Sequence, residues 1–310
     1  MLIDRNTMAA ASFNAPGPRN WALLFFLSLV WGGAFMSMAV ALEQYGPLTV
    51  AAGRIGIGAL ALLAVVAVTR PGELAIRDLK ILGLMLVLGV LNFALPFSLL
   101  AWGLQRVPSA FAGVTMGSSP ILVLLLAYLF VPEEQIGPRR IAGIILGFVG
   151  LLVLILPGAS PGVSTGETVI PKIACVAAAL CYSIGAILIR RAPPIPPMVF
   201  TAGMLTAGAL VLTPFALLVE GLPEVTNSRA TWAMFYAGIF PTGLAFLLRV
   251  VLIRSVGPIF MSLVAYIVPL WAVLLGVILL GETLELSTYF AALIILSGVA
   301  LTQLRLLRPL

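Results

Sequence analysis

The chain alternates long apolar stretches with short polar connections along almost its whole length. Ten stretches have the size of a membrane-spanning helix, which needs about 20 mostly apolar residues to cross about 30 Å of hydrocarbon. They cover residues 20–41, 47–68, 79–102, 107–131, 140–157, 170–189, 197–219, 230–250, 257–280 and 288–305. The longest connections, residues 158–169 and 220–230, are too short to fold as domains. The pattern predicts an all-α integral membrane protein of ten transmembrane helices, with its function inside the helix bundle.

The composition also indicates a lipid environment. Of the 310 residues, 62% are hydrophobic and 9% are charged, and the mean hydropathy is +1.18. Soluble domains carry about 25% charged residues, so too few are present here to cover a surface that faces water. The chain has no histidine and no GxxxxGK motif. These absences argue against a histidine-based metal site, a Ser-His-Asp triad and an ATP-driven motor, so we expect no catalytic residue, no metal and no cofactor.

Basic residues predict the orientation, because cytoplasmic loops carry an excess of Lys and Arg. With the N-terminus in the cytoplasm, Arg106, Lys172 and Arg229 lie outside and Arg54 lies within a span. All the other basic residues then lie on the cytoplasmic side: Arg5, Arg19, Arg70, Arg77, Lys80, Arg139, Arg140, Arg190, Arg191, Arg249, Arg254, Arg305 and Arg308. Both termini are therefore predicted to be cytoplasmic. The net charge of +6 is explained by the anionic inner leaflet and requires no nucleic acid.

The two halves of the chain resemble each other. The stretch PLTVAAGRIGIGALAL at 47–62 aligns with PMVFTAGMLTAGALVL at 197–212, and at an offset one residue shorter Gly89 and Phe97 align with Gly238 and Phe246. Each half holds five predicted helices, and an odd number forces the second copy to enter the membrane in the opposite orientation. We expect an N-terminal tail at 1–19, repeat 1 at 20–157, an external linker at 158–169 and repeat 2 at 170–307. Inverted repeats are a means of alternating access, with the substrate site at the repeat interface near the midplane.

Several of these segments resemble a known family. The motifs WGGAF at 31–35 and AAGRIGIGAL at 51–60 are similar to the EamA repeats of the drug/metabolite transporter (DMT) superfamily. Both SSPILVLLLAYLFVPEEQIGPRRIAGIILGFVGLLVL at 118–154 and VPLWAVLLGVILLGETLELSTYFAALIILSGV at 268–299 resemble later helices of that repeat. Within the superfamily the chain is most similar to the YddG-type exporters of aromatic and other amino acids. The resemblance implies a multi-pass protein of the bacterial inner (plasma) membrane that exports amino acids, other metabolites or lipophilic cations.

The resemblance also implies a central cavity lined by the first, third, fourth, sixth, eighth and ninth helices, with the fifth and tenth at the periphery. Four-helix multidrug relatives carry a membrane-buried glutamate in their first helix that handles protons. Neither the first nor the sixth predicted helix here contains an acidic residue, and all eleven acidic residues fall in tails, loops or helix ends. We therefore expect facilitated, gradient-driven transport without a buried proton-coupling carboxylate.

Charged, polar and aromatic residues inside the spans are the candidate site residues, because charges within the membrane are costly and usually functional. Arg54 is a possible anchor for a substrate carboxylate; alternatively, its side chain snorkels outward or braces helix ends. The substrate-cavity candidates are Trp31, Phe35, Asn92, Phe93, Phe97, Thr115, Ser118, Ser119, Tyr182, Phe246, Ser262, Tyr266 and Trp271. The hinge or gating candidates are Pro96, Pro120, Pro241 and Pro269, since proline frees a backbone carbonyl one turn earlier. For the aromatic and hydroxyl residues, the alternatives are ordinary packing and hydrogen bonding between helices.

Two further patterns concern the surface of the bundle. Aromatic residues at span ends are typical of the belt at the membrane interface, and this group comprises Trp21, Tyr45, Trp232 and Tyr289. Gly143, Gly147 and Gly150 have GxxxG-like spacing, which either drives dimerisation or packs the fifth helix against its own chain. We favour packing within the chain and a monomer.

The leading hypothesis is thus a transporter that exports amino acids, aromatic or neutral, or similar small metabolites by alternating access. Its expected partners are a small-molecule substrate and the lipid bilayer. Efflux of lipophilic cations is the main alternative, although a desolvated cation needs a carboxylate that the spans do not supply. A membrane-embedded enzyme is a third reading, which the lack of histidine and of a buried acid pair disfavours.

Overall fold

The computed structural model describes residues 16–70, 72, 78–130, 137–155, 165–190, 192–246, 248–249, 252, 256 and 263–303. Across these residues the regular secondary structure is helical, and no strand is present. The first half contains α1 (Pro18–Ala41), α2 (Pro47–Thr69), α3 (Leu79–Gly89), η2 (Val90–Ala94), α4 (Leu95–Gly103), α5 (Ser109–Gly117), α6 (Ser119–Phe130) and α7 (Pro138–Ile155). The second half contains α8 (Thr165–Arg190), α9 (Pro197–Glu220), α10 (Arg229–Ala237), η3 (Gly238–Leu244), α12 (Val264–Leu280) and α13 (Leu286–Gln303). The all-helical prediction is confirmed for this part of the chain.

The helix boundaries follow local signals in the sequence. Proline stands in the first turn of α1, α2 and α9, where its fixed φ suits a helix and its missing N–H has no helical acceptor. Asp78 caps α3 by accepting the N–H of Lys80 at 2.8 Å, and Ser228 caps α10 by accepting the N–H of Thr231 at 3.2 Å. One boundary differs from expectation: α8 begins at Thr165, inside the predicted linker, and so includes Glu167 in its first turn.

Many of these helices suit a membrane. Among the described residues, five stretches are long and apolar enough to cross a bilayer: Pro18–Ala41, Pro47–Thr69, Leu79–Gly103, Ser109–Leu126 and Pro197–Glu220. Four shorter apolar helices follow, at Ile141–Ile155, Val169–Gly185, Val264–Leu280 and Leu286–Leu301. Large apolar side chains lie exposed on the outer faces, for example Leu60, Val68, Leu210 and Leu218. An exposed apolar surface of this kind fits lipid and not water.

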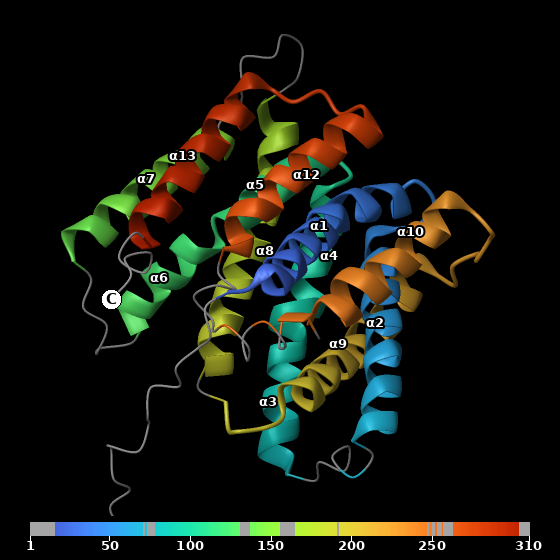
Figure 1. Ribbon diagram of the computed structural model, residues 1–310. Helices are drawn as coiled ribbons and strands as arrows, with labels where there is room; N and C mark the ends of the chain where they lie inside the picture. The colour runs from blue at the N-terminus through green and yellow to red at the C-terminus, as the bar shows by residue number, and fades with distance from the viewer. Residues whose placement is uncertain are drawn as a thin grey trace, which may run out of the picture.

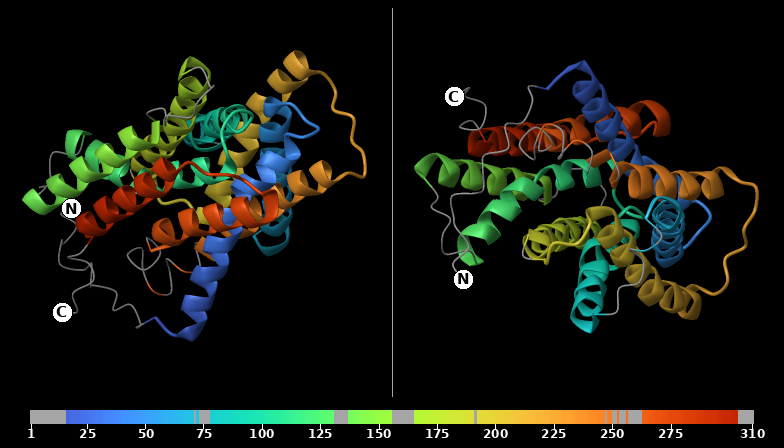
Figure 2. Two further views of the ribbon diagram at one scale, coloured as in Figure 1. Left: turned by 90° about the horizontal axis from the view of Figure 1, so that it is seen from above. Right: turned by 60° about the horizontal axis from the view of Figure 1, so that its bottom comes forward.

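The helices pack in a pattern that repeats between the halves (Figures 1 and 2). Helix α2 packs against α9, α5 against α12, and α7 against α13, so each of these pairs joins one half to the other. Helix α1 of the first half packs against α10 and α12 of the second, and α8 of the second half packs against α4 and α6 of the first. The pair α7 and α13 lies side by side at one edge of the molecule, away from α2, α3 and α9. The fifth predicted helix and the tenth are therefore peripheral, as the resemblance implies.

Glycine allows the close approach of α7 to α13. A Cβ added at Gly298 of α13 would lie 2.8 Å from the carbonyl oxygen of Gly143 and 2.8 Å from the nitrogen of Gly147. A Cβ at Gly150 would lie 2.7 Å from Cγ1 of Ile295. Small residues at helix interfaces let the backbones come near each other. The GxxxG-like spacing thus packs this helix against its own chain, in line with the alternative that we favoured.

The aromatic residues at span ends divide into two groups. Trp21, Trp232 and Tyr289 are exposed, which suits an interface belt. Tyr45 does not follow that prediction, because it is buried and its hydroxyl is hydrogen-bonded to Thr231. The contact lies between the α1–α2 connection and the first turn of α10, so Tyr45 joins two parts of the bundle instead of facing lipid.

Candidate functional site

The two halves contain the same helical irregularity at the same place. The π-helical segment η2 (Val90–Ala94) follows Gly89, and η3 begins at Gly238, the residue that aligns with Gly89. In a π-helix the backbone hydrogen bonds skip one residue further than in an α-helix, and such segments recur at functional sites. A proline accompanies each segment: Pro96 lies in the first turn of α4, two residues after η2, and Pro241 lies inside η3. These two of the predicted hinge prolines therefore lie at backbone irregularities.

Matching glycine contacts hold each π-helical segment against a helix of the other half. A Cβ added at Gly58 of α2 would lie 3.0 Å from the carbonyl oxygen of Gly238 in η3. A Cβ added at Gly208 of α9 would lie 2.9 Å from the carbonyl oxygen of Gly89, next to η2. Gly58 aligns with Gly208 in the repeat, as Gly89 does with Gly238. Both π-helical segments thus approach the partner half so closely that only glycine fits.

Five aromatic side chains lie between these segments, and we call them the aromatic cluster: Trp31, Phe93, Phe97, Tyr182 and Phe246. Their rings form a continuous chain, with centroid distances of 6.4 Å from Trp31 to Phe246, 5.6 Å from Phe246 to Phe93, 5.9 Å from Phe93 to Phe97 and 6.3 Å from Phe97 to Tyr182. The indole Nε1 of Trp31 donates to the carbonyl oxygen of Pro241 at 3.0 Å. All five were predicted cavity residues, and they come from α1, η2, α4, α8 and the turn after η3.

Arg54 lies against the aromatic cluster and does not snorkel outward. Its side chain is only 5% exposed, and its Cζ lies 3.9 Å from the centroid of the Phe97 ring. Its Nε donates to Oγ1 of Thr242 at 3.0 Å, and one terminal nitrogen lies 2.9 Å from Sδ of Met38. No acidic side chain among the described residues forms a salt bridge with it. The guanidinium is thus a buried cation held by an aromatic face, a hydroxyl and a thioether, with donor groups left over for an anion.

Asn92 lies in η2 and faces α8. Its Nδ2 donates to the carbonyl oxygen of Leu88 at 3.1 Å, and a side chain at Gly185 of α8 would collide with the amide group. Its Oδ1 accepts no hydrogen bond from the described part of the chain. A buried amide with one end fixed presents the other as an oriented acceptor, which suits a substrate N–H or ammonium group.

The remaining candidates lie along the seam between α5–α6 and α12, with α1 beside it. Phe35 and Ala272 both contact Gly113, and Pro269 contacts Gly117. The hydroxyls of Thr115 and Ser118 are buried and donate to carbonyls of their own helix, at 2.9 Å to Phe111 and 2.6 Å to Thr115. Trp271 donates to Ser28 Oγ at 3.1 Å. Ser119, Pro120 and Tyr266 are half-buried near this seam. The structure does not bring these residues into ring contact with the aromatic cluster, and Ser262 lies outside the described residues.

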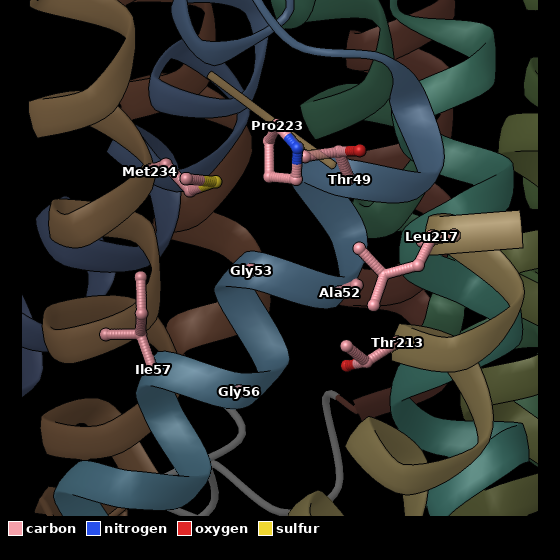
Figure 3. A pocket seen from close by; sticks show the side chains of 10 residues that line it. Thr49, Ala52, Gly53, Gly56, Ile57, Thr213, Leu217, Pro223 and Met234 are labelled. Atoms are coloured by element: carbon pink, nitrogen blue, oxygen red, sulfur yellow. The ribbon is translucent and has the colours of Figure 1, made fainter. Parts of the chain in front are cut away.

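A cleft of about 260 Å³ opens elsewhere, between α2, α9 and α10 (Figure 3). Its lining includes Thr49, Gly53 and Gly56 of α2, facing Thr213 of α9 and Met234 of α10. Residues 49, 53 and 56 share one face of the helix, whereas Arg54 and Gly58 point about half a turn away. The cleft therefore lies on the side of α2 away from the aromatic cluster, and its mostly apolar lining offers little to a polar substrate.

Two residues near the cluster were not selected from the sequence as site residues. The hydroxyl of Thr242 accepts a hydrogen bond from Arg54 Nε. It also donates one, at 2.9 Å, to the carbonyl oxygen of Ala237, which lies five residues earlier in the π-helical register. Arg249, which we had assigned to the cytoplasmic surface, has its Cζ 5.9 Å from the Phe246 ring centroid. The sequence signal for Thr242 is its place beside Pro241, because the polar neighbour of a proline in a span often satisfies the freed backbone.

Comparison with known proteins places the chain in a family. The model of the EamA-like transporter family matches it twice, over residues 19–156 and 170–304. The chain is 28% identical to the uncharacterized inner membrane transporter YedA of Escherichia coli K12 over 91% of this chain and 89% of YedA. It is 26% identical to the uncharacterized transporter YdfC of Bacillus subtilis, over 89% of this chain and 88% of YdfC.

Two further similarities were found. An S-adenosylmethionine/S-adenosylhomocysteine transporter of Chlamydia trachomatis is 27% identical, over 87% of this chain and 84% of its own length. A solved crystal structure superposes with a TM-score of 0.63 at 23% identity, covering 94% of this chain and 99% of that one, which supports the fold. The two matches of the family model together span most of the sequence, one in each half. The chain therefore belongs to the EamA-like transporter family.

Proposed function

We propose that this protein exports amino acids, or similar small metabolites with a carboxylate and an aromatic or apolar side chain, across the bacterial inner membrane. Its ten helices form two inverted repeats with both termini in the cytoplasm, and it works by alternating access. The pairing of α2 with α9, α5 with α12 and α7 with α13 supports a two-fold relation between the halves. The substrate binds between η2 and η3, at the aromatic cluster.

The observation that carries this proposal is Arg54. A charged side chain in the membrane interior costs about 3 kcal/mol or more, and such residues usually have a partner or a function. No described acidic residue pairs with the guanidinium, whose Cζ lies on the Phe97 ring. A substrate carboxylate completes this site, while the aromatic cluster contacts the side chain and Asn92 Oδ1 receives the ammonium group. A lipophilic cation that lacks a carboxylate would instead be repelled by Arg54.

A second substrate class follows from one relative. S-adenosylmethionine and S-adenosylhomocysteine, the substrates in the name of the Chlamydia trachomatis relative, each join an amino-acid group to a planar purine. Both parts fit the same set of groups, the carboxylate at Arg54 and the ring at the aromatic cluster. These compounds therefore belong in any substrate panel, next to the aromatic and neutral amino acids.

Uptake into proteoliposomes tests the proposal. The purified protein is reconstituted and given labelled amino acids, S-adenosyl compounds and a cationic dye, with and without a pH gradient. We expect saturable uptake of at least one carboxylate-bearing substrate, no dependence on the pH gradient, and no uptake of the dye. Uptake of the dye alone would establish the alternative of lipophilic cation efflux. Uptake that requires a pH gradient would contradict transport without a proton-coupling carboxylate.

A further inference from the structure

Two glutamates join the halves of the molecule at one end of the bundle. Glu220 is the last residue of α9. Its carboxylate accepts hydrogen bonds from the backbone N–H groups of Leu48 and Thr49 in the first turn of α2, with N–O distances of 2.9 and 2.8 Å. The carboxylate of Glu282, two residues after α12, accepts the N–H groups of Ser109 and Ala110 in the first turn of α5, at 2.7 and 3.1 Å. In each case an acid of the second half caps a helix of the first half.

These contacts combine two favourable terms. The first N–H groups of a helix have no partner within the helix, so a carboxylate can satisfy two of them at once. The positive end of the helix dipole adds electrostatic attraction, and hydrogen bonds with a charged acceptor are stronger than neutral ones. Ser109 Oγ, beside the Glu282 carboxylate, is a fully buried hydroxyl oxygen that lacks a hydrogen-bond partner. A buried hydroxyl without a partner costs free energy in this arrangement of the helices. The two hydrogen bonds of the Glu282 carboxylate offset that cost.

More hydrogen bonds close the same end of the molecule. The side-chain nitrogen of Gln44, between α1 and α2, donates at 3.0 Å to the carbonyl oxygen of Glu224 and at 3.0 Å to Oγ1 of Thr226. Tyr45 bonds to Thr231 at the start of α10. All these residues belong to the face that the basic residues predict to be external. Hydrogen bonds therefore join the two halves at this end of the bundle.

The repeat offers no matching acid for one of these contacts at the opposite end. In the alignment of the halves, α9 corresponds to α2 and Arg70 stands where Glu220 stands. An arginine side chain has no hydrogen-bond acceptor, so it cannot cap a helix N-terminus as Glu220 does. The N-cap residue of α9 is Pro196, whose side chain provides no cap of its own. The counterpart of Glu282 is Glu133, which lies outside the described residues.

We propose that Glu220 and Glu282 are the latches of the external gate, which hold α2 and α5 of the first half to α9 and α12 of the second while the external face is closed. The proposal requires that the helices joined by the two latches separate together, so that breaking one latch opens the whole face. This inference rests on alternating access as proposed above, but its test needs no substrate.

The test uses cysteine reporters buried behind each latch. Val50 and Ala112 are fully buried and lie one and two residues beyond the capped N–H groups of α2 and α5. Val50→Cys and Ala112→Cys are made separately in a chain with Cys175→Ala and Cys181→Ala, and labelling by a water-soluble maleimide is timed in detergent. We expect Glu220→Gln to raise the labelling rate of both reporters by about tenfold, and Glu282→Gln to do the same. Glu43→Gln, a change at an exposed acid of the same face, leaves both rates unchanged.

Three results would overturn the proposal. A higher labelling rate only at the reporter next to the altered glutamate would show local fraying of the helix N-terminus and no gate. An equal effect of Glu43→Gln would show a general effect of surface charge. Loss of the folded protein with Glu220→Gln, and with the charge-preserving Glu220→Asp, would make the contact a requirement of the fold. Transport activity is recorded separately, so a failed latch and a wrong substrate class remain distinguishable.

Discussion

The two π-helical segments, η2 and η3, have equivalent places in the two halves but present different side chains. The segment η2 follows Gly89, and η3 begins at the aligned Gly238. Each of these glycines contacts a second glycine on a helix of the partner half. The polar groups of the two segments differ, however. The segment η2 carries the amide of Asn92, whereas η3 carries the carbonyl of Pro241 and the hydroxyl of Thr242. The backbone is repeated and the chemistry is not.

The same contrast holds for charge. Arg54 lies on α2, and the alignment places Met204 at the corresponding position of α9. At the proposed site, a substrate between the halves would meet a cation from one side and apolar or dipolar groups from the other. In the proposed mechanism, the repeated backbone geometry serves the exchange between two conformations, and the side chains that differ set the orientation of the substrate. Substitutions at these positions separate the two roles.

The largest effect is expected at Arg54, which only one half supplies. Arg54→Gln should reduce uptake of a carboxylate-bearing substrate by about 100-fold, since removal of one partner of a buried charged pair costs several kcal/mol. Arg229→Gln is the control, because that arginine is exposed at the start of α10. Initial uptake rates in proteoliposomes measure both. If Arg54→Gln transports as well as the parent protein, the guanidinium serves packing alone.

The glycine contacts test the repeated backbone. A Cβ at Gly58 would meet Cγ2 of Thr242 at 2.7 Å, whereas a Cβ at Gly56 on the same helix would meet nothing within 4 Å. Gly58→Ala should therefore lower stability by about 1–3 kcal/mol through overpacking, and Gly56→Ala should be neutral or slightly stabilising. Gly208→Ala should behave like Gly58→Ala, because it faces Gly89 in the same way. Thermal unfolding of the purified variants measures this; equal stability of all three would refute the close contact.

A smaller effect is expected at Thr242. Thr242→Val keeps the shape but removes the acceptor for Arg54 Nε, which should raise KM for a carboxylate substrate by about tenfold. Thr242→Ser keeps the hydroxyl and should retain KM within about twofold of the parent value. The expected signature is a change in KM with little change in kcat, because a merely structural defect would reduce both.

The smallest effect is expected at Asn92. Asn92→Ala should weaken the binding of a substrate with an ammonium group by about fivefold. The binding of the analogue that lacks the amino group should be unaffected. Ser98→Ala is the matched control, since the Ser98 hydroxyl donates to the carbonyl of Ala94 within the same helix, at 2.8 Å. Each compound is used to compete with uptake of a labelled substrate, and the inhibition gives the affinity of the protein for each. Equal loss for the two ligands would place Asn92 outside the binding site.

Sequence reasoning recovered the helices and selected the residues of the aromatic cluster. Apolar length predicted helix boundaries such as 47–68 and 197–219 to within a residue, because a span must match a fixed thickness of hydrocarbon. It also selected the five aromatic residues that the bundle brings together. These were recoverable because few chemically distinctive residues occur within the spans.

Other features could not be read from one sequence. The environment of Arg54 depends on which side of α2 faces Phe97 and Thr242, residues 43 and 188 positions away along the chain. The contacts of Glu220 and Glu282 join segments more than 170 residues apart. For the same reason, Tyr45 was assigned to the membrane interface although it bonds to Thr231. Local patterns fix an element, and tertiary packing decides which polar groups meet.

Equilibrium binding of a matched pair of ligands tests the central claim most directly. An aromatic amino acid is compared with the amine that lacks only its carboxylate, using the purified protein and its Arg54→Gln variant. We expect the parent protein to bind the amino acid about 100-fold more tightly than the amine, and the variant to lose most of that preference. Equal preference in the two proteins, or tighter binding of the amine by the parent protein, would contradict a carboxylate site at Arg54.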